Sequence, residues 1–184
     1  MEKILQRTSS KHSVNLSSRI EKEMYNSLVK DAEAKGISIN SLINSMIKKY
    51  LIWDRFAEEM GLIPLTKRTL QKIFKTMNDE QIKKIGREVG GTVPQELIYL
   101  SYNKFDFVNL MKVVEISDAR FGKVKHNINN STHSINIVHG VSENFSKFLA
   151  ETHQSLADTL SLRFTIEHID SNMICMEFEK PYDS

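Results

Sequence analysis

Three polar residues near the amino terminus have the types and spacing to recognise nucleic-acid bases. Lys11, Ser13 and Asn15 alternate with residues that include Val14 and Leu16. Successive side chains of an extended strand point to opposite faces, so the three polar residues share one face. An asparagine amide can make a bidentate contact with adenine, a lysine can donate to the acceptors of guanine, and a serine can bond to either base. The pattern predicts a short strand with a hydrogen-bonding face, although ordinary edge strands show the same alternation.

The residues after this strand predict an amphipathic helix. Ser17 or Ser18 is expected to cap it, and Glu21 stands where the acidic residue of a capping box would lie. An apolar stripe then repeats at four-residue spacing as far as Ala32. The strand therefore leads directly into a helix with one face to bury.

Gly36 and Ser38 predict a hinge before a second amphipathic helix. Glycine fits the left-handed residue that ends a helix, and serine is a favoured first cap. A two-stranded ribbon is marginal alone in water, and two helices cannot enclose a core of this size. We therefore expect residues 11–60 to be half of an obligate homodimer, with assembly into a tetramer left open. The expected dimer core is Val14, Leu16, Leu28, Leu42, Ile43, Met46 and Ile47.

The segment 11–51 resembles the ribbon-helix-helix family of DNA-binding proteins, to which the Arc and methionine repressors belong. The resemblance rests on residues 13–16, on the helix that follows and on residues 36–43. It implies that a two-stranded ribbon enters the major groove of double-stranded DNA. The implied base-reading residues are Lys11, Ser13 and Asn15. None of them is arginine, so modest base discrimination is expected.

The same resemblance implies that the start of the second helix holds a DNA phosphate. The groups would be the Ser38 side chain and the backbone amides of Ile39 and Asn40, because helix starts carry unpaired N–H donors. The family also includes toxin-neutralising antitoxins. A protein that binds a partner protein through its C-terminal half is therefore the alternative to a DNA-binding transcriptional regulator.

Composition and charge place limits on the class of protein. The apolar runs are short, no secretory leader is evident, and there is one cysteine, Cys175, so we expect a cytoplasmic protein without a membrane segment. Residues 11–90 hold fifteen Lys or Arg against ten Asp or Glu, whereas residues 91–184 hold eight against twelve. This asymmetry favours a polyanion as the partner of the first half.

The remaining chain predicts a flexible arm at residues 1–10 and a helical connector at residues 61–122. The connector begins with basic residues on the face opposite its apolar stripe. These residues are Lys67, Arg68 and Lys72, with Lys75 one turn further on. They could add phosphate contacts, but a solvated helix face is the simpler interpretation.

Residues 123–184 predict a C-terminal α+β domain of order ββαββ. Alternating segments at 123–128 and 134–138 precede a helix capped by Ser142, and a second hairpin joins residues 163–168 to 173–179. The expected fold class is thus α+β and mostly helical, with an antiparallel sheet and a helix packed on it. We expect such a domain to serve in sensing or oligomerisation.

Five histidines and Cys175 in this last domain raise the alternative of a metal-responsive repressor. The weak candidate ligands are His126, His168 and Cys175. The nickel-responsive repressors, which join a ribbon-helix-helix module to a small α+β domain, have a similar ligand segment. Here one histidine stands in place of their paired histidines, and the cysteine is displaced by one residue. We expect structural histidines, no metal and no cofactor. No arrangement of residues indicates a catalytic site, so we do not expect an enzyme.

Overall fold

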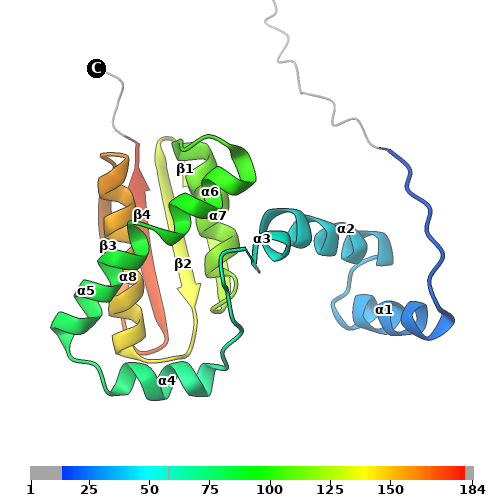
Figure 1. Ribbon diagram of the computed structural model, residues 1–184, viewed down its shortest axis with the longest axis horizontal. Coiled ribbons are helices and arrows are strands. Elements are labelled where there is room, and N and C mark those ends of the chain that lie inside the picture. Colours follow the sequence, from blue (N-terminus) through cyan, green and yellow to red (C-terminus); the bar gives the residue numbers. More distant parts are fainter. Residues whose placement is uncertain (1–13, 58, 181–184) are drawn as a thin grey trace, which may run out of the picture. The chain divides into compact units, whose positions relative to one another are not determined.

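The computed structural model describes residues 14–57 and 59–180 of the 184-residue chain. It divides into two compact units, residues 1–46 and residues 47–184. The larger unit is an α+β fold in which helices cover a four-stranded antiparallel sheet (Figure 1). Within the described ranges, no helix is both long enough and apolar enough to cross a bilayer.

Among the described residues, the elements that precede the first strand are all helical. They are α1 (Lys22–Ala34), α2 (Ile39–Lys49), the π-helical turn η1 (Tyr50–Asp54), α3 (Arg55–Ala57), α4 (Lys67–Lys75), α5 (Asp79–Gly90), α6 (Val93–Tyr102) and α7 (Phe107–Asp118). The remaining elements are β1 (Lys123–Asn129), β2 (Thr132–Val138), α8 (Glu143–Thr159), β3 (Arg163–Ile169) and β4 (Met173–Glu179).

The sheet confirms the predicted α+β class and the order ββαββ. Its strands lie in the order β1-β2-β4-β3, and all neighbours are antiparallel. Ile135 and Ile137 of β2 face the helices together with Ile174, Met176 and Phe178 of β4, and all five are fully buried. The intervening residues of these strands are mostly polar and face the other side. Strict alternation therefore gives one buried and one open face.

Helices α4 to α7 belong to the same core as the sheet, so residues 61–122, which we predicted to be a helical connector, are part of the larger unit. Phe74 of α4 packs edge-on against Phe145 of α8, with ring centres 5.1 Å apart. Helix α5 lies along α8, and a Cβ added at Gly90 would stand 2.1 Å from the carbonyl oxygen of Thr152. The apolar stripes of these helices are buried in one core with the helix-facing side of the sheet.

The end of the N-terminal module also differs from the prediction that it runs from 11 to 60. Trp53 and Phe56 pack against the core of the larger unit. Arg120 of α7 lies over the Trp53 ring at 4.7 Å and donates to Asp54 Oδ1 at 2.9 Å. The residues after Met46 therefore belong to the larger unit. Burial of the large aromatic side chains in its core stabilises this arrangement.

Helix α1 begins later than predicted. Its cap is Glu21, whose side chain makes no capping hydrogen bond, rather than Ser17 or Ser18. Residues 14–21 have no strand or helix, and Lys11 and Ser13 lie outside the described residues. An isolated strand leaves its backbone groups unpaired, so a single chain provides no ladder for Val14 to Leu16 to join.

Candidate nucleic-acid interface

The turn between α1 and α2 has the predicted chemistry. Gly36 adopts a φ of +64°, and the Ile37 amide donates to the carbonyl oxygen of Ala32 at 3.0 Å, which closes the end of α1. The Ser38 hydroxyl then accepts from the Ser41 amide at 3.1 Å and caps α2. The hinge thus fixes where the second helix begins.

The start of α2 leaves hydrogen-bond donors available. No group of the described residues accepts from the backbone amides of Ile39 and Asn40, as expected for the first turn of a helix. Ser38 and Asn40 are exposed, and Ile39 is half-buried. Basic residues near the start are absent from α2 itself, whose lysines Lys48 and Lys49 lie in its last turn. An anion at this helix start would therefore bind mainly through backbone N–H groups and the helix dipole.

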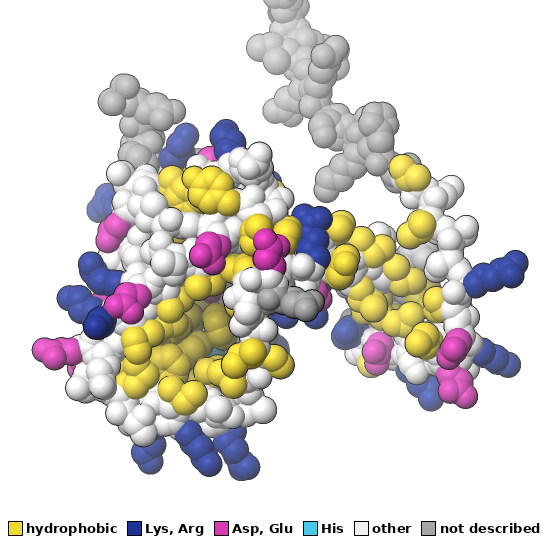
Figure 2. Space-filling model, in the orientation of Figure 1, with side chains coloured by type: hydrophobic (Ala, Val, Ile, Leu, Met, Phe, Trp, Pro, Cys, Tyr) yellow, Lys and Arg dark blue, Asp and Glu magenta, His cyan; other side chains and the backbone are white. Residues whose placement is uncertain are grey.

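The α1–α2 unit buries very little of its apolar surface. Ala32 and Leu42 are its buried residues, and Leu28 and Ile43 are half-buried. Other predicted dimer-core residues are exposed, at 90% for Val14, 83% for Leu16, 49% for Met46 and 39% for Ile47. Ile20, Met24 and Tyr25 are exposed as well. Figure 2 shows a broad apolar area on the visible face of the α1–α2 unit.

Exposed apolar surface of this kind is typical of interaction sites. Two helices of 13 and 11 residues bring many large side chains to a face that one chain does not cover. Asn15 is exposed beside Val14 and Leu16 in the same segment. Asn15 and two of the predicted core residues, Val14 and Leu16, thus occupy the segment that lacks regular structure in one chain.

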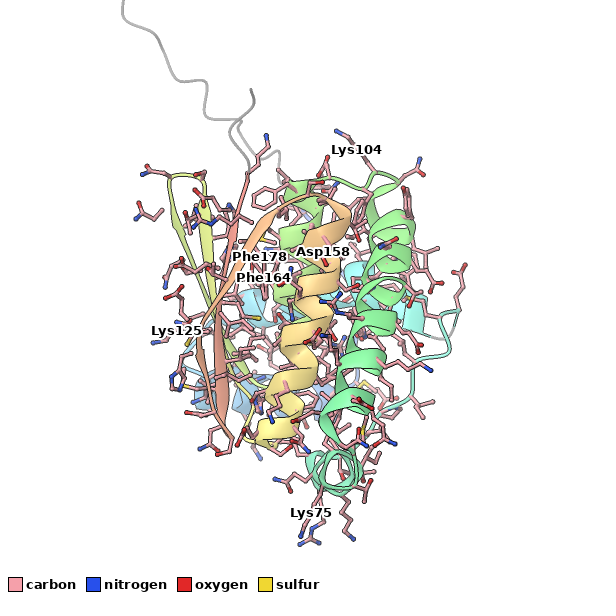
Figure 3. All side chains as sticks on the ribbon, turned by 90° about the vertical axis from the view of Figure 1, so that its left-hand side faces the viewer. Lys75, Lys104, Lys125, Asp158, Phe164 and Phe178 are labelled. Carbon is pink, nitrogen blue, oxygen red and sulfur yellow. The ribbon has the colours of Figure 1, made fainter. Side chains whose placement is uncertain are left out.

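A basic surface lies on α4. Thr66 caps this helix, accepting from the Thr69 amide at 3.2 Å, while Phe74 holds the inner face against α8. The outer face carries exposed Lys67, Arg68, Lys72 and Lys75. Figure 2 shows this basic edge along α4, and Lys75 is labelled there in Figure 3. No carboxylate of the described residues pairs with any of the four.

The weak metal candidates do not come together. His126 on β1 and His168 on β3 stand on opposite edges of the sheet, about 14 Å apart at ordinary strand spacing. His126 Nε2 instead lies 2.9 Å from His133 Nδ1, and His168 Nε2 donates to Asp170 at 2.8 Å. Among the described residues, no group of three or more His, Cys, Asp or Glu side chains is arranged to hold a metal ion.

The turn between β3 and β4 explains the position of His168. The carboxylate of Asp170 accepts from His168 and from the amides of Asn172 and Met173, and these bonds lower its pKa to about 2. His168 therefore orders a hairpin turn. Cys175, which pairs with His168 across the strands, is half-buried on the open sheet face.

Two buried histidines were not singled out by sequence reasoning. His139 accepts from the Val141 amide at 3.0 Å through Nδ1 and bonds to the Ser146 hydroxyl at 2.8 Å through Nε2. Burial lowers its pKa and keeps it neutral. Ser146 in turn donates to the carbonyl oxygen of Asp170, so this chain of bonds ties β2 and α8 to the β3–β4 turn.

His153 forms a buried ion pair with Asp118. Its Nε2 donates to Asp118 Oδ2 at 3.0 Å, its Nδ1 donates to the carbonyl oxygen of Leu149 at 2.7 Å, and both side chains of the pair are 4% exposed. Burial lowers the pKa of His153, but the charge and hydrogen bond of Asp118 outweigh burial, so the pKa is raised. The pair joins α7 to α8 and is buried within the fold.

The buried histidines therefore serve the fold, whereas the apolar surface of α1 and α2 and the basic face of α4 are exposed. Comparison with known proteins adds no relative: no protein-family model matches the chain, and no curated protein is significantly similar to it.

Proposed function

We propose that this chain is a sequence-specific DNA-binding regulator that works as a homodimer through its N-terminal residues. The observation that supports this most is the apolar surface of α1 and α2, which stays exposed in one chain beside a helix start with unpaired donors. A second copy would bury that surface and provide a strand partner for residues 11–16. The free energy gained by burying apolar surface on association would offset the conformational entropy lost when this segment becomes ordered.

In the proposed dimer, two antiparallel copies of residues 11–16 form a ribbon that fits the major groove. Lys11, Ser13 and Asn15 lie on its outer face, and Val14 and Leu16 lie on its inner face. Each α2 start binds a backbone phosphate through Ser38 and the amides of Ile39 and Asn40. The larger unit is proposed to sense a signal or to join further copies.

Asn15→Ala is expected to weaken binding to a preferred DNA site by about 1–3 kcal/mol and to leave binding to random DNA nearly unchanged. The reason is that an amide reads the base edge, whereas phosphate contacts give the affinity common to all sequences. Fluorescence anisotropy with both duplexes measures the two effects. Asn26→Ala, at an exposed position of α1, is the matched control. Equal losses on both duplexes would show that Asn15 does not read bases.

Lys67→Ala combined with Lys72→Ala tests whether α4 adds to the phosphate contacts. If both residues contact phosphates, affinity falls on every sequence, and the slope of log affinity against log salt becomes shallower by about 0.9 for each lost contact. Lys83→Ala with Lys84→Ala, two exposed lysines of α5, is the control of equal charge. An unchanged slope in the α4 variant would assign its basic face to solvent.

The class of function is tested by binding of the purified chain to mixed duplex fragments over a range of salt. A DNA-binding regulator shows affinity that falls steeply with salt. Absence of binding at low salt, together with a small protein that co-purifies with the chain, would instead support the antitoxin-like alternative.

A further inference from the structure

Two histidines on the helix-facing side of the β1–β2 hairpin contact each other through their ring nitrogens. His126 of β1 is paired with Ile135, and His133 of β2 is paired with Ile128, so the two rings are diagonal neighbours across the strands. His126 Nε2 lies 2.9 Å from His133 Nδ1, and the ring centres are 5.0 Å apart. At this distance the two nitrogens form a hydrogen bond, with one proton between the rings.

Helix α7 supplies the other partners of the two rings. Strand β1 is at the edge of the sheet, and α7 packs beside it (Figure 1). Glu115 Oε2 lies 3.5 Å from His126 Nδ1, so His126 uses one ring nitrogen for each neighbour. Phe107 packs edge-on against His133, with ring centres 4.8 Å apart. Three titratable side chains from three elements therefore form one connected chain, in the order Glu115, His126 and His133.

The charged groups around this chain of contacts supply no second counter-charge. Lys112 of α7 donates to Asn109 and lies over the Tyr102 ring. Strand β2 holds no acidic or basic residue besides His133. Lys180, which follows β4, is itself positive. Alternation places the charged residues of β1 and β4 on the open face of the sheet, and these are Lys123, Lys125, Glu177 and Glu179. Within the described ranges, Glu115 is the carboxylate paired with either ring.

The arrangement has room for one positive charge. With one imidazolium, His126 donates from Nδ1 toward Glu115 and from Nε2 to the unprotonated Nδ1 of His133. A proton added at His133 Nδ1 would direct two N–H groups at each other across 2.9 Å. It would also place a second positive charge beside the first, with one carboxylate to balance both. In agreement with this, burial and then the charge of His126 lower the pKa of His133.

We propose that Glu115, His126 and His133 form a pH-sensitive latch between α7 and the β1–β2 hairpin, which opens when His133 takes up a proton. The latch does not depend on DNA binding. Opening breaks the hydrogen bond between the rings at an edge strand, and β1 has a strand neighbour on one side only. Acid should therefore loosen β1 and α7 while the pairing of β2 with β4 persists.

The pH dependence of the latch has a definite sign. The pKa of His133 is lowered in the closed form, so the open form binds the proton more tightly. Opening becomes easier as pH falls below the ordinary histidine pKa of about 6.5. The opening constant should rise by up to about tenfold per pH unit until the closed form is protonated as well. The pKa of His153 is raised instead, so acid does not weaken its pair with Asp118 in this way.

Hydrogen exchange of the full-length chain measures the opening. Exchange is followed by mass spectrometry from about pH 7.5 to about pH 5 and corrected for the intrinsic pH dependence of amide exchange. Peptides from β1 and α7 should lose protection severalfold or more as pH falls, whereas peptides from β4 should change little. Ring-carbon NMR shifts of the chain with labelled histidine then follow the titration of His133 itself, which should lie below the ordinary pKa.

Two variants separate the latch from a general effect of acid. His133→Asn keeps an acceptor near the place of Nδ1 but cannot be protonated there, so exchange in β1 should no longer respond to acid. His126→Gln keeps a donor toward His133 and removes the charge, so the pKa of His133 should rise toward its ordinary value. His168→Asn, in the β3–β4 turn, is the control and should leave the response of β1 unchanged.

Circular dichroism checks the fold of each variant, and the titration of the unmodified chain tests the latch even if one variant does not fold. Three results would overturn the proposal. They are a His133 ring that titrates at or above the ordinary histidine pKa, exchange in β1 that is indifferent to acid in the unmodified chain, and an acid response that persists in folded His133→Asn.

Discussion

Met46→Asp is expected to convert the chain to a folded monomer that no longer binds DNA. Met46 is 49% exposed in the single chain, so the substitution leaves the buried contacts of α1 and α2 in place. In the proposed dimer the same position is enclosed, and two unpaired carboxylates would then be buried at the interface. Such a charge costs about 3–5 kcal/mol, which is a loss of at least a hundredfold in association.

Asn44→Asp is the matched control, because it introduces the same carboxylate two residues away at an exposed polar position of α2. Sedimentation equilibrium should show the shift to monomer for Met46→Asp alone, and circular dichroism should show equal helical content for both variants. DNA affinity is then measured at fixed salt. A Met46→Asp chain that still forms a dimer through its N-terminal residues would show that the exposed apolar surface is not the interface.

The second large effect is expected at the buried pair of Asp118 and His153. Asp118→Asn should lower the free energy of unfolding by about 3–5 kcal/mol at pH 6, because it leaves a buried imidazolium without its counter-charge. Asp158→Asn, on the exposed side of α8, should change stability by less than about 0.5 kcal/mol. Urea unfolding followed by circular dichroism measures both values.

The pH dependence of this effect has a definite sign. The pKa of His153 is raised in the folded chain, so the folded state binds the proton more tightly than the unfolded state. The stabilisation is therefore fully present below the unfolded histidine pKa of about 6.5 and is lost as pH rises through the folded pKa. The difference between Asp118→Asn and the unmodified chain should shrink at high pH. A difference that grows with pH would contradict a charged His153.

Local sequence patterns predicted much of the larger unit. Thr66, Asn78 and Ser142 cap their helices through side-chain hydrogen bonds, as expected for residues whose oxygens can accept from the third helical amide. The alternation in residues 134–138 and 173–179 predicted two strands with one buried face. These features depend on neighbours close in sequence, so they can be predicted from the sequence alone.

Features that depend on distant contacts were missed. Gly86 and Gly90 allow α5 to approach α8, but glycine in a helix carries no sign of the partner it meets. The charged partner of His153 lies 35 residues away. One signal was available: His153 stands four residues after Leu149 on the apolar stripe of α8, which predicts a buried histidine in need of a partner.

The N-terminal module likewise combines a local feature with one that depends on a distant partner. The hinge at Gly36 and Ser38 is local, and the structure has it as predicted. The strand at residues 11–16 depends on a second copy, so one chain does not form it over Val14 to Leu16. Helix α1 begins after Glu21 rather than after Ser17 or Ser18.

We propose that a dimer of this chain reads DNA sequence with the ribbon face around Asn15. Repeated selection of bound sites from a random duplex pool, with the full-length protein at physiological salt, tests it most directly. We expect enrichment of one short motif with two-fold related half-sites, and loss of that enrichment for Asn15→Ala and Met46→Asp. A pool that remains random after repeated selection, or one enriched equally by both variants, would contradict it.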